Sequence, residues 1–302
     1  EAASAIEVER KRYEDLGAID ISARLDLNSG TSNEDFKEGD ALEPDYWADK
    51  LAEGYHPRLV FSRWEFDQLK TMVGGSDALG KLHNCMMSVA DASVGAASLS
   101  YTLDASGRRL LAVSREALAR IASCAYAYRL TGGSQYLQQA ATDLKNVSAF
   151  KDWNPTHFLD IAEMAAAVAI GYDWLYDWLT PEQREELVKN LKEKHLDTVL
   201  DYYTNYATKK FPSRYTFLMS DSNHGVLNNS SIIIQALSIA ELDPAYSAEI
   251  MSHAMHYMNV PLYQLYPDSL WPEGYDYWGF VGPMAIRAVM SMKATFGDCL
   301  GY

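Results

Sequence analysis

The stretch from Ile161 to Gln183 is IAEMAAAVAIGYDWLYDWLTPEQ, and it predicts two consecutive helices. Apolar and aromatic residues recur every three or four positions as far as Leu179, which places them on one face of a helix. The alanine-rich part is apolar on nearly every side, a pattern typical of a helix inside a core. Thr180, Pro181 and Gln183 then supply an N-cap, a first-turn proline and a capping-box partner. A second helix is therefore expected to begin directly after the first.

Helical blocks separated by short breakers continue on both sides of this pair, and almost nothing in the sequence resembles a strand. Gly132-Gly133 separates two of these blocks, and Asp243-Pro244 supplies an acidic cap and a first-turn proline to another. Short connections predict that neighbouring helices run antiparallel. The predicted helices span 62–73, 77–97, 114–130, 134–147, 156–178, 181–204, 224–240, 244–265 and 282–297.

The predicted fold class is all-α, built from antiparallel helical hairpins. An α/α toroid, an irregular α-solenoid and a bundle with additions all agree with such a pattern. Because the helix around 162–170 is apolar on nearly every side, it suits the walled-in inner ring of a toroid better than a one-layer solenoid. Residues 1–45 are polar and poorly periodic, so we interpret them as an N-terminal arm and 46–302 as the helical domain.

The composition argues against several classes of partner. The 302 residues carry 26 Lys and Arg against 41 Asp and Glu, a formal net charge of −15. Nucleic acid and anionic membrane surfaces both favour a basic face, so neither is an expected partner. No stretch approaches the roughly 18 apolar residues that predict a transmembrane helix. Cys85, Cys124 and Cys299 lack metal-ligand spacing, and we expect buried, unpaired thiols and no metal site.

Polar and aromatic residues gather at three breakers, spanning 55–61, 219–230 and 267–280, where a rigid scaffold usually presents functional groups. Asn223 and His224 open a helix in the second segment, where free N–H groups and the helix dipole favour an anion. Tyr277 in the third segment is suited to proton transfer, and its neighbour Trp278 offers a face for a sugar ring. The loop and hairpin between the two segments allow both to reach one cleft.

Five pieces of the sequence, taken in order, resemble the helical domain of heparinase II/III-type polysaccharide lyases and the related alginate lyases. The likeness extends from about residue 56 to residue 300, and it depends on all five pieces occurring in the same order. The five pieces are HPRLVF at 56–61, AIGYDWLYDWLTPEQR at 169–184, SNHG at 222–225, ALSIAELDP at 236–244 and PEGYDYW at 272–278.

This resemblance implies an incomplete (α/α)6 toroid, followed in full-length members by β-sandwich domains. Six hairpins require twelve helices. The nine predicted helices, together with the absence of a β-rich tail, then indicate a fragment or a short member of the family. The implied activity is β-elimination at a uronic acid, with Asn223 and His224 neutralising the carboxylate and Tyr277 transferring protons. The implied partner is an acidic polysaccharide and the implied location periplasmic or extracellular. We expect no cofactor, since hydrogen-bond donors can neutralise the carboxylate.

Further candidates for substrate binding come from aromatic and basic residues. Tyr275 is an alternative to Tyr277 as the reacting phenol. The ordinary interpretation of the basic run 209–215 is a solvated loop. That of Asn223 and His224 is a helix cap with a surface histidine, and that of Trp153 and Tyr277 is packing. The expected sugar platforms are Trp153, His157, Trp271 and Trp278, and the expected anion contacts are Lys210 and Arg214.

Four carboxylates invite other interpretations. Glu163 lies within the apolar helix, where a structural acid satisfied by a partner is expected. Glu273 would repel a uronate, so a structural role in its turn is favoured. Asp173 and Asp177 are four residues apart and would suit the paired carboxylates of an inverting hydrolase. A glycoside hydrolase on the same scaffold and a non-catalytic carbohydrate-binding module therefore stand as alternatives to the lyase.

Overall fold

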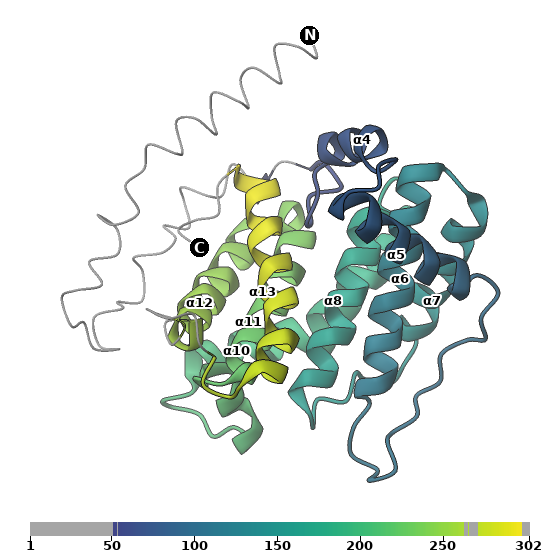
Figure 1. Cartoon of the computed structure of the whole chain (residues 1–302). Helices are drawn as coiled ribbons and strands as arrows, with labels where there is room; N and C mark the ends of the chain where they lie inside the picture. The colour runs from purple at the N-terminus through teal and green to yellow at the C-terminus, as the bar shows by residue number, and fades with distance from the viewer. Residues whose placement is uncertain (1–50, 53, 263–264, 266–270, 298–302) are drawn as a thin grey trace.

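The computed structural model describes residues 51–52, 54–262, 265 and 271–297, and this part of the chain is built from helices, with no strand (Figure 1). The all-α prediction is confirmed. The predicted N-terminal arm and Cys299 lie outside the described residues. The α-helices are α4 (Arg63–Met72), α5 (Ala78–Ser93), α6 (Leu111–Thr131), α7 (Ser134–Ser148), α8 (Phe158–Trp174), α9 (Pro181–Leu191), α10 (Asp197–Asn205), α11 (Asn223–Ser238), α12 (Pro244–Leu262) and α13 (Tyr275–Phe296).

The helix α8 lies at the centre of the core, and every one of its residues is buried. This agrees with its nearly uniform apolar surface. The capping box predicted for the next helix is present, because the Thr180 hydroxyl accepts from Gln183 N and the Gln183 side chain accepts from Thr180 N. Glu163, the carboxylate within α8, pairs with Arg115 of α6 at 3.1 Å, so its predicted role as a structural acid with a partner is confirmed.

Four long helices, α6, α8, α11 and α13, pack side by side in that order. Other helices cover them: α5 and α7 pack on α6, α9 on α8, and α12 on α11 (Figure 1). Contacts between first turns show that the four helices begin at one end of the molecule. His157 before α8 meets His224 of α11, and Asn223 binds Glu273, just before α13.

The row of four helices is curved. Its two outer members, α6 and α13, meet where the guanidinium of Arg115 lies 4.6 Å from the ring centre of Phe280. Both residues lie near the beginnings of their helices. The beginnings of α6, α8, α11 and α13 therefore surround a shared region, called here the N-terminal end of the row.

Several helix boundaries differ from the sequence prediction, and two of the differences are described here. The helix α13 begins at Tyr275, although residue 282 was predicted, so Tyr275 and Tyr277 lie in its first turn. The segment 267–280 was interpreted as a breaker between helices, but the helix includes residues 275–280 and packs on α11. The predicted helix 181–204 is interrupted by a π-helical turn, η1 (Lys192–Leu196), before α10. Such turns insert an extra residue that periodicity alone does not reveal.

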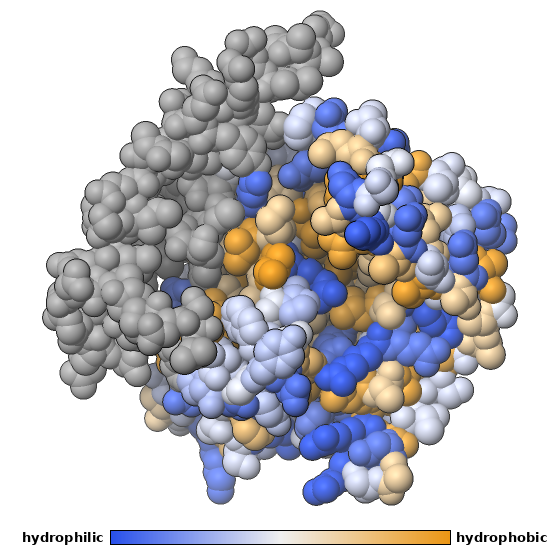
Figure 2. All heavy atoms as spheres, in the orientation of Figure 1, coloured by the Kyte–Doolittle hydropathy of each residue, from blue (hydrophilic) through white to orange (hydrophobic). Residues whose placement is uncertain are grey.

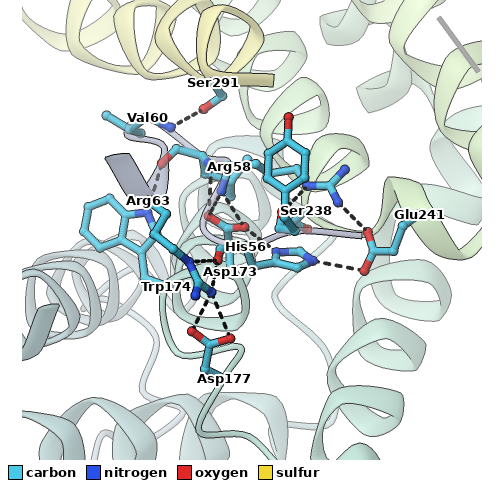
Figure 3. Close-up of polar contacts among 12 residues, drawn as sticks. His56, Arg58, Val60, Arg63, Asp173, Trp174, Asp177, Ser238, Glu241 and Ser291 are labelled. Atoms are coloured by element: carbon cyan, nitrogen blue, oxygen red, sulfur yellow. Dashed lines mark hydrogen bonds and ion pairs between the residues drawn. The ribbon is translucent and has the colours of Figure 1, made fainter. Parts of the chain in front are cut away.

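The segment 55–61 is tied to the core through Asp173 at the end of α8 (Figure 3). The fully buried Asp173 carboxylate accepts the backbone N–H groups of Arg58 and Leu59 at 2.8–3.0 Å. It also lies 2.6 Å from Nδ1 of His56, whose Nε2 is 3.0 Å from Glu241. The buried Arg58 pairs with the same glutamate at 3.2 Å. We call His56, Arg58, Asp173 and Glu241 the buried ion network.

The buried ion network should make stability depend on pH. Burial opposes a charge on His56, but the hydrogen bonds that its ring donates to Asp173 and Glu241, together with the charges of these carboxylates, outweigh it and raise the pKa of His56 above 6.5. Arg58 is the other basic side chain of the network. The stabilisation from protonated His56 is therefore full below about pH 6.5 and is lost as pH rises through the folded-state pKa.

The substitution His56→Gln should accordingly lower the free energy of unfolding, relative to wild type, more in acid than in alkali. The measurement is the free energy of urea unfolding for both proteins at about pH 6 and about pH 9. We expect the difference between wild type and variant to shrink at the higher pH. A difference that stays constant or grows with pH would mean that His56 is not held as an imidazolium.

Two further sequence expectations are tested by the described residues. Cys124 is buried and free, as predicted, whereas Cys85 is free but exposed on α5, so the prediction that it is buried is wrong. Among the helices that the structure describes, none is long and apolar enough to cross a membrane.

Candidate functional site

The first turn of α11 carries the predicted Asn223 and His224, and a carboxylate of the protein itself caps it. Ser222 makes no side-chain cap. Instead, Glu273 accepts Asn223 N at 2.5 Å and the Asn223 side-chain amide at 2.8 Å. Trp271 donates its indole N–H to the same carboxylate at 3.1 Å. The expected structural role of Glu273 is thus confirmed, and the helix start is shown to bind a carboxylate.

A close backbone approach shapes this helix start. A Cβ atom at Gly225 would lie 2.0 Å from the carbonyl oxygen of Ser220, so only glycine fits. The chain turns back tightly at this point, which presents Asn223 and His224 at the N-terminal end of the row. The Asn223 side chain is buried, and its Oδ1 has no hydrogen-bond partner.

The His224 ring lies between two other rings. Phe217 stacks on it with a centroid separation of 4.3 Å, and His157 meets it edge to face at 6.3 Å. Burial, together with the nearby charges of His157 and Arg109, lowers the pKa of His224 to about 4, although Glu273 acts in the opposite direction. His224 is therefore an uncharged imidazole at neutral pH, a form that can accept a proton.

His157 was predicted as a sugar platform, and the structure places it beside His224 at the start of α8. Its Nδ1 lies 2.6 Å from Asp160, which is fully buried. The other oxygen of Asp160 accepts Leu110 N at 2.5 Å and the side-chain amide of Asn154 at 2.6 Å. His157 thus has a fixed carboxylate on one side and a second imidazole on the other.

The aromatic residues of the third segment divide into buried and exposed groups. Trp271 is buried and stacks on Trp278, so it supports that ring and is not an open platform, which corrects its predicted role. Tyr275, Tyr277 and Trp278 are exposed by 85%, 46% and 38%, so all three can meet a ligand. Hydrophobic and hydrophilic residues are intermixed on the face of the molecule seen in Figure 2.

The prediction that Trp153 stacks on a sugar is wrong. The side chain is completely buried, its N–H donates to Val147 O, and Lys194 lies 5.2 Å from the ring centre. No face of this indole is open to a ligand.

The predicted basic contacts do not gather around His224. Lys210 is exposed in the loop after α10. Arg214, in the 3-10 helix η2 (Ser213–Met219), lines a pocket with Lys151, Lys194 and His195 that neither Asn223 nor His224 lines. Arg109 is the basic residue whose charge acts on His224, and the sequence analysis missed it.

The paired-carboxylate interpretation of Asp173 and Asp177 is also wrong. Asp173 is buried and fully used by the segment 55–61 (Figure 3). Asp177 is exposed and pairs with Arg63 at 2.9 Å and with Arg129 at 3.4 Å. These aspartates stabilise the fold and leave no open space between them for a sugar and a water molecule.

Sequence reasoning also missed Asp160 and Phe217. Asp160 follows His157 by three residues at a helix start, a spacing that brings two side chains together on one helix face and was available as a signal. Nothing local marks Phe217, because its partner His224 lies in another element. Within the described residues, no group of three or more His, Cys, Asp or Glu side chains is placed to hold a metal ion.

Comparison with known proteins gives no family for this chain. Neither the models of protein families nor the curated protein sequences contain a match to it.

Proposed function

We propose that this protein cleaves a uronate-containing polysaccharide by β-elimination. The observation that carries the proposal is the uncharged His224 at a helix start that binds a carboxylate. A uronate carboxylate is the same chemical group as that of Glu273. Backbone N–H groups and the dipole of α11 favour an anion there.

The scaffold that we propose is an incomplete (α/α)6 toroid. The curved row of α6, α8, α11 and α13, covered by α5, α7, α9 and α12, supports this arrangement. In such a scaffold, the N-terminal end of the row is the rim at which a polymer would lie. Because large polymers do not enter the cytoplasm, the proposal includes a periplasmic or extracellular location.

In the proposed reaction, the uronate carboxylate replaces Glu273 on Asn223. Gly274 follows this glutamate with a φ of 93°, a conformation that favours glycine and lets the chain turn sharply beside it. Asn223 and His224 stabilise the negative charge that develops when the proton next to the carboxylate leaves. Tyr277 takes part in the proton transfers, and Trp278 stacks on a sugar ring.

Atoms and electrons balance within the substrate. The C5–H bond and the bond from C4 to the glycosidic oxygen break, a C4=C5 double bond forms, and a proton goes to the departing oxygen. No oxidant or reductant is required. No water is incorporated into the product and no covalent intermediate with the enzyme forms, which distinguishes this step from glycoside hydrolysis.

The test incubates the full chain with alginate, heparan sulfate and hyaluronan. Ultraviolet absorbance of the conjugated double bond and the number of new reducing ends are followed together. We expect both to rise in parallel with at least one polymer. Reducing ends without absorbance would show a hydrolase, and binding without either signal would show a carbohydrate-binding module; each result would contradict the proposal.

A further inference from the structure

His157 has the surroundings of a residue that moves protons, although sequence alone suggested a sugar platform. Asp160 is held by Leu110 N and Asn154 in addition to His157, so its carboxylate cannot turn away. A carboxylate at 2.6 Å keeps the hydrogen on Nδ1 of His157. Nε2 is then the ring atom that exchanges a proton, and the side chain is 21% exposed.

The two imidazoles at this end of the row have contrasting environments. His157 has the Asp160 carboxylate, which stabilises a positive ring. His224 is packed against Phe217, and its buried Nδ1 has no hydrogen-bond partner. The other charged groups that act on His224 are Arg109 and Glu273, which oppose each other. Of the two rings, His157 is thus the one that a fixed hydrogen bond orients, and it is the better placed to transfer a proton.

β-Elimination needs two proton transfers, one from carbon and one to the departing oxygen. Tyr277 is 46% exposed and can approach a sugar from the side of α13. His157 approaches from α8, so a chain lying across the beginning of α11, which stands between these two helices, would have a proton carrier on each side.

We propose that His157 is the second proton-transfer residue of this site, with Nε2 donating a proton to the departing glycosidic oxygen and Asp160 as its positioning residue. This inference rests on the proposed lyase function. Tyr277, in its deprotonated form, takes the C5 proton, and His224 remains uncharged beside the developing anion. After the step Tyr277 is a neutral phenol and His157 is a neutral imidazole. Tyr277 then releases a proton to water and His157 takes one from water, so the protons balance before the next cycle.

The test compares wild type with His157→Gln on the polymer that wild type cleaves. We expect kcat to fall about 100-fold, because a lost general acid typically costs 10²–10⁴. KM should change less than about threefold, and the loss of activity that we expect for wild type at high pH should vanish in the variant. Imidazole added to His157→Ala should restore part of the turnover. His83→Gln on α5, where His83 contacts Tyr126, is the matched control and should behave as wild type.

The outcomes separate the two proposals. If wild type forms no unsaturated product, the lyase function fails and this inference with it. If wild type is active but His157→Gln keeps its kcat, or changes only KM with the same pH profile, His157 is a binding residue and only this inference is wrong. If His157→Gln does not fold, NMR titration of the wild-type histidines decides, because Nε2 of His157 must titrate at the pH where kcat falls.

Discussion

Alanine at position 224 should lower turnover of a uronate polymer about 10²–10⁴-fold, the range typical of a lost proton-transfer or anion-stabilising group. The His224 ring contacts Phe217 and His157, and its Nδ1 makes no hydrogen bond within the protein. Its removal should therefore cost the fold much less than it costs catalysis. Tyr277→Phe removes only a hydroxyl from a side chain that is 46% exposed, and it should also suppress turnover.

The pH profile of the wild type provides an independent measurement for His224. Because the uncharged ring is the active form and its pKa lies at about 4, activity should persist to about pH 5 and fall as the ring is protonated below that. Circular dichroism at each pH separates this loss from unfolding, and His83→Ala serves as the histidine control. If His224→Ala and Tyr277→Phe both keep wild-type turnover, β-elimination at this site is wrong.

Asp173→Ala should lower the free energy of unfolding by about 3–5 kcal/mol, the usual cost of removing one partner from a buried ion pair. The substitution leaves the N–H groups of Arg58 and Leu59 without their acceptor, and it leaves His56 with one carboxylate in place of two. An unsatisfied buried donor adds its own cost of about 1–3 kcal/mol. The segment 55–61 should then detach from the end of α8.

Asp177→Ala is the matched control for this measurement. Asp177 follows Asp173 by four residues, but its side chain is 53% exposed, and it pairs with the exposed Arg63 and, at a longer distance, with Arg129. Exposed pairs contribute about 0–1 kcal/mol, so the control should unfold close to wild type in urea. Equal losses in the two variants would show that the buried ion network does not hold the segment.

Local chemistry explains which elements the sequence predicted well. Thr180 and Gln183 form their capping box because the partners are three residues apart, and α8 is buried on all sides because its residues are apolar on all sides. The start of α13 was missed because the segment 267–280 was interpreted as a breaker, whereas packing on α11, which the sequence does not display, accompanies a helix that begins at Tyr275. Glycine and proline mark probable boundaries, and tertiary contacts override them.

The candidate site was predictable in its residues more than in its contacts. Asn223 was identified from its place at a helix start, but its binding to Glu273 joins positions far apart in the chain. Trp153 was misjudged because an indole looks the same in sequence whether its faces are open or packed, and the structure buries it completely. The pairing of His157 with His224 depends on the neighbouring positions of α8 and α11, which periodicity does not determine.

The shared direction of α6, α8, α11 and α13 has a consequence for how an anion reaches this protein. With a net charge of −15, the molecule repels a polyanion on average. The first turns of these four helices each carry about half a positive charge, whereas α7, α9 and α12, which follow α6, α8 and α11 through short connections, present theirs at the opposite end. The attraction at the N-terminal end of the row is therefore local and acts on an anion that already lies near these first turns. Because salt weakens both this attraction and the overall repulsion, capture of a polyanion should slow less with ionic strength than for a basic protein.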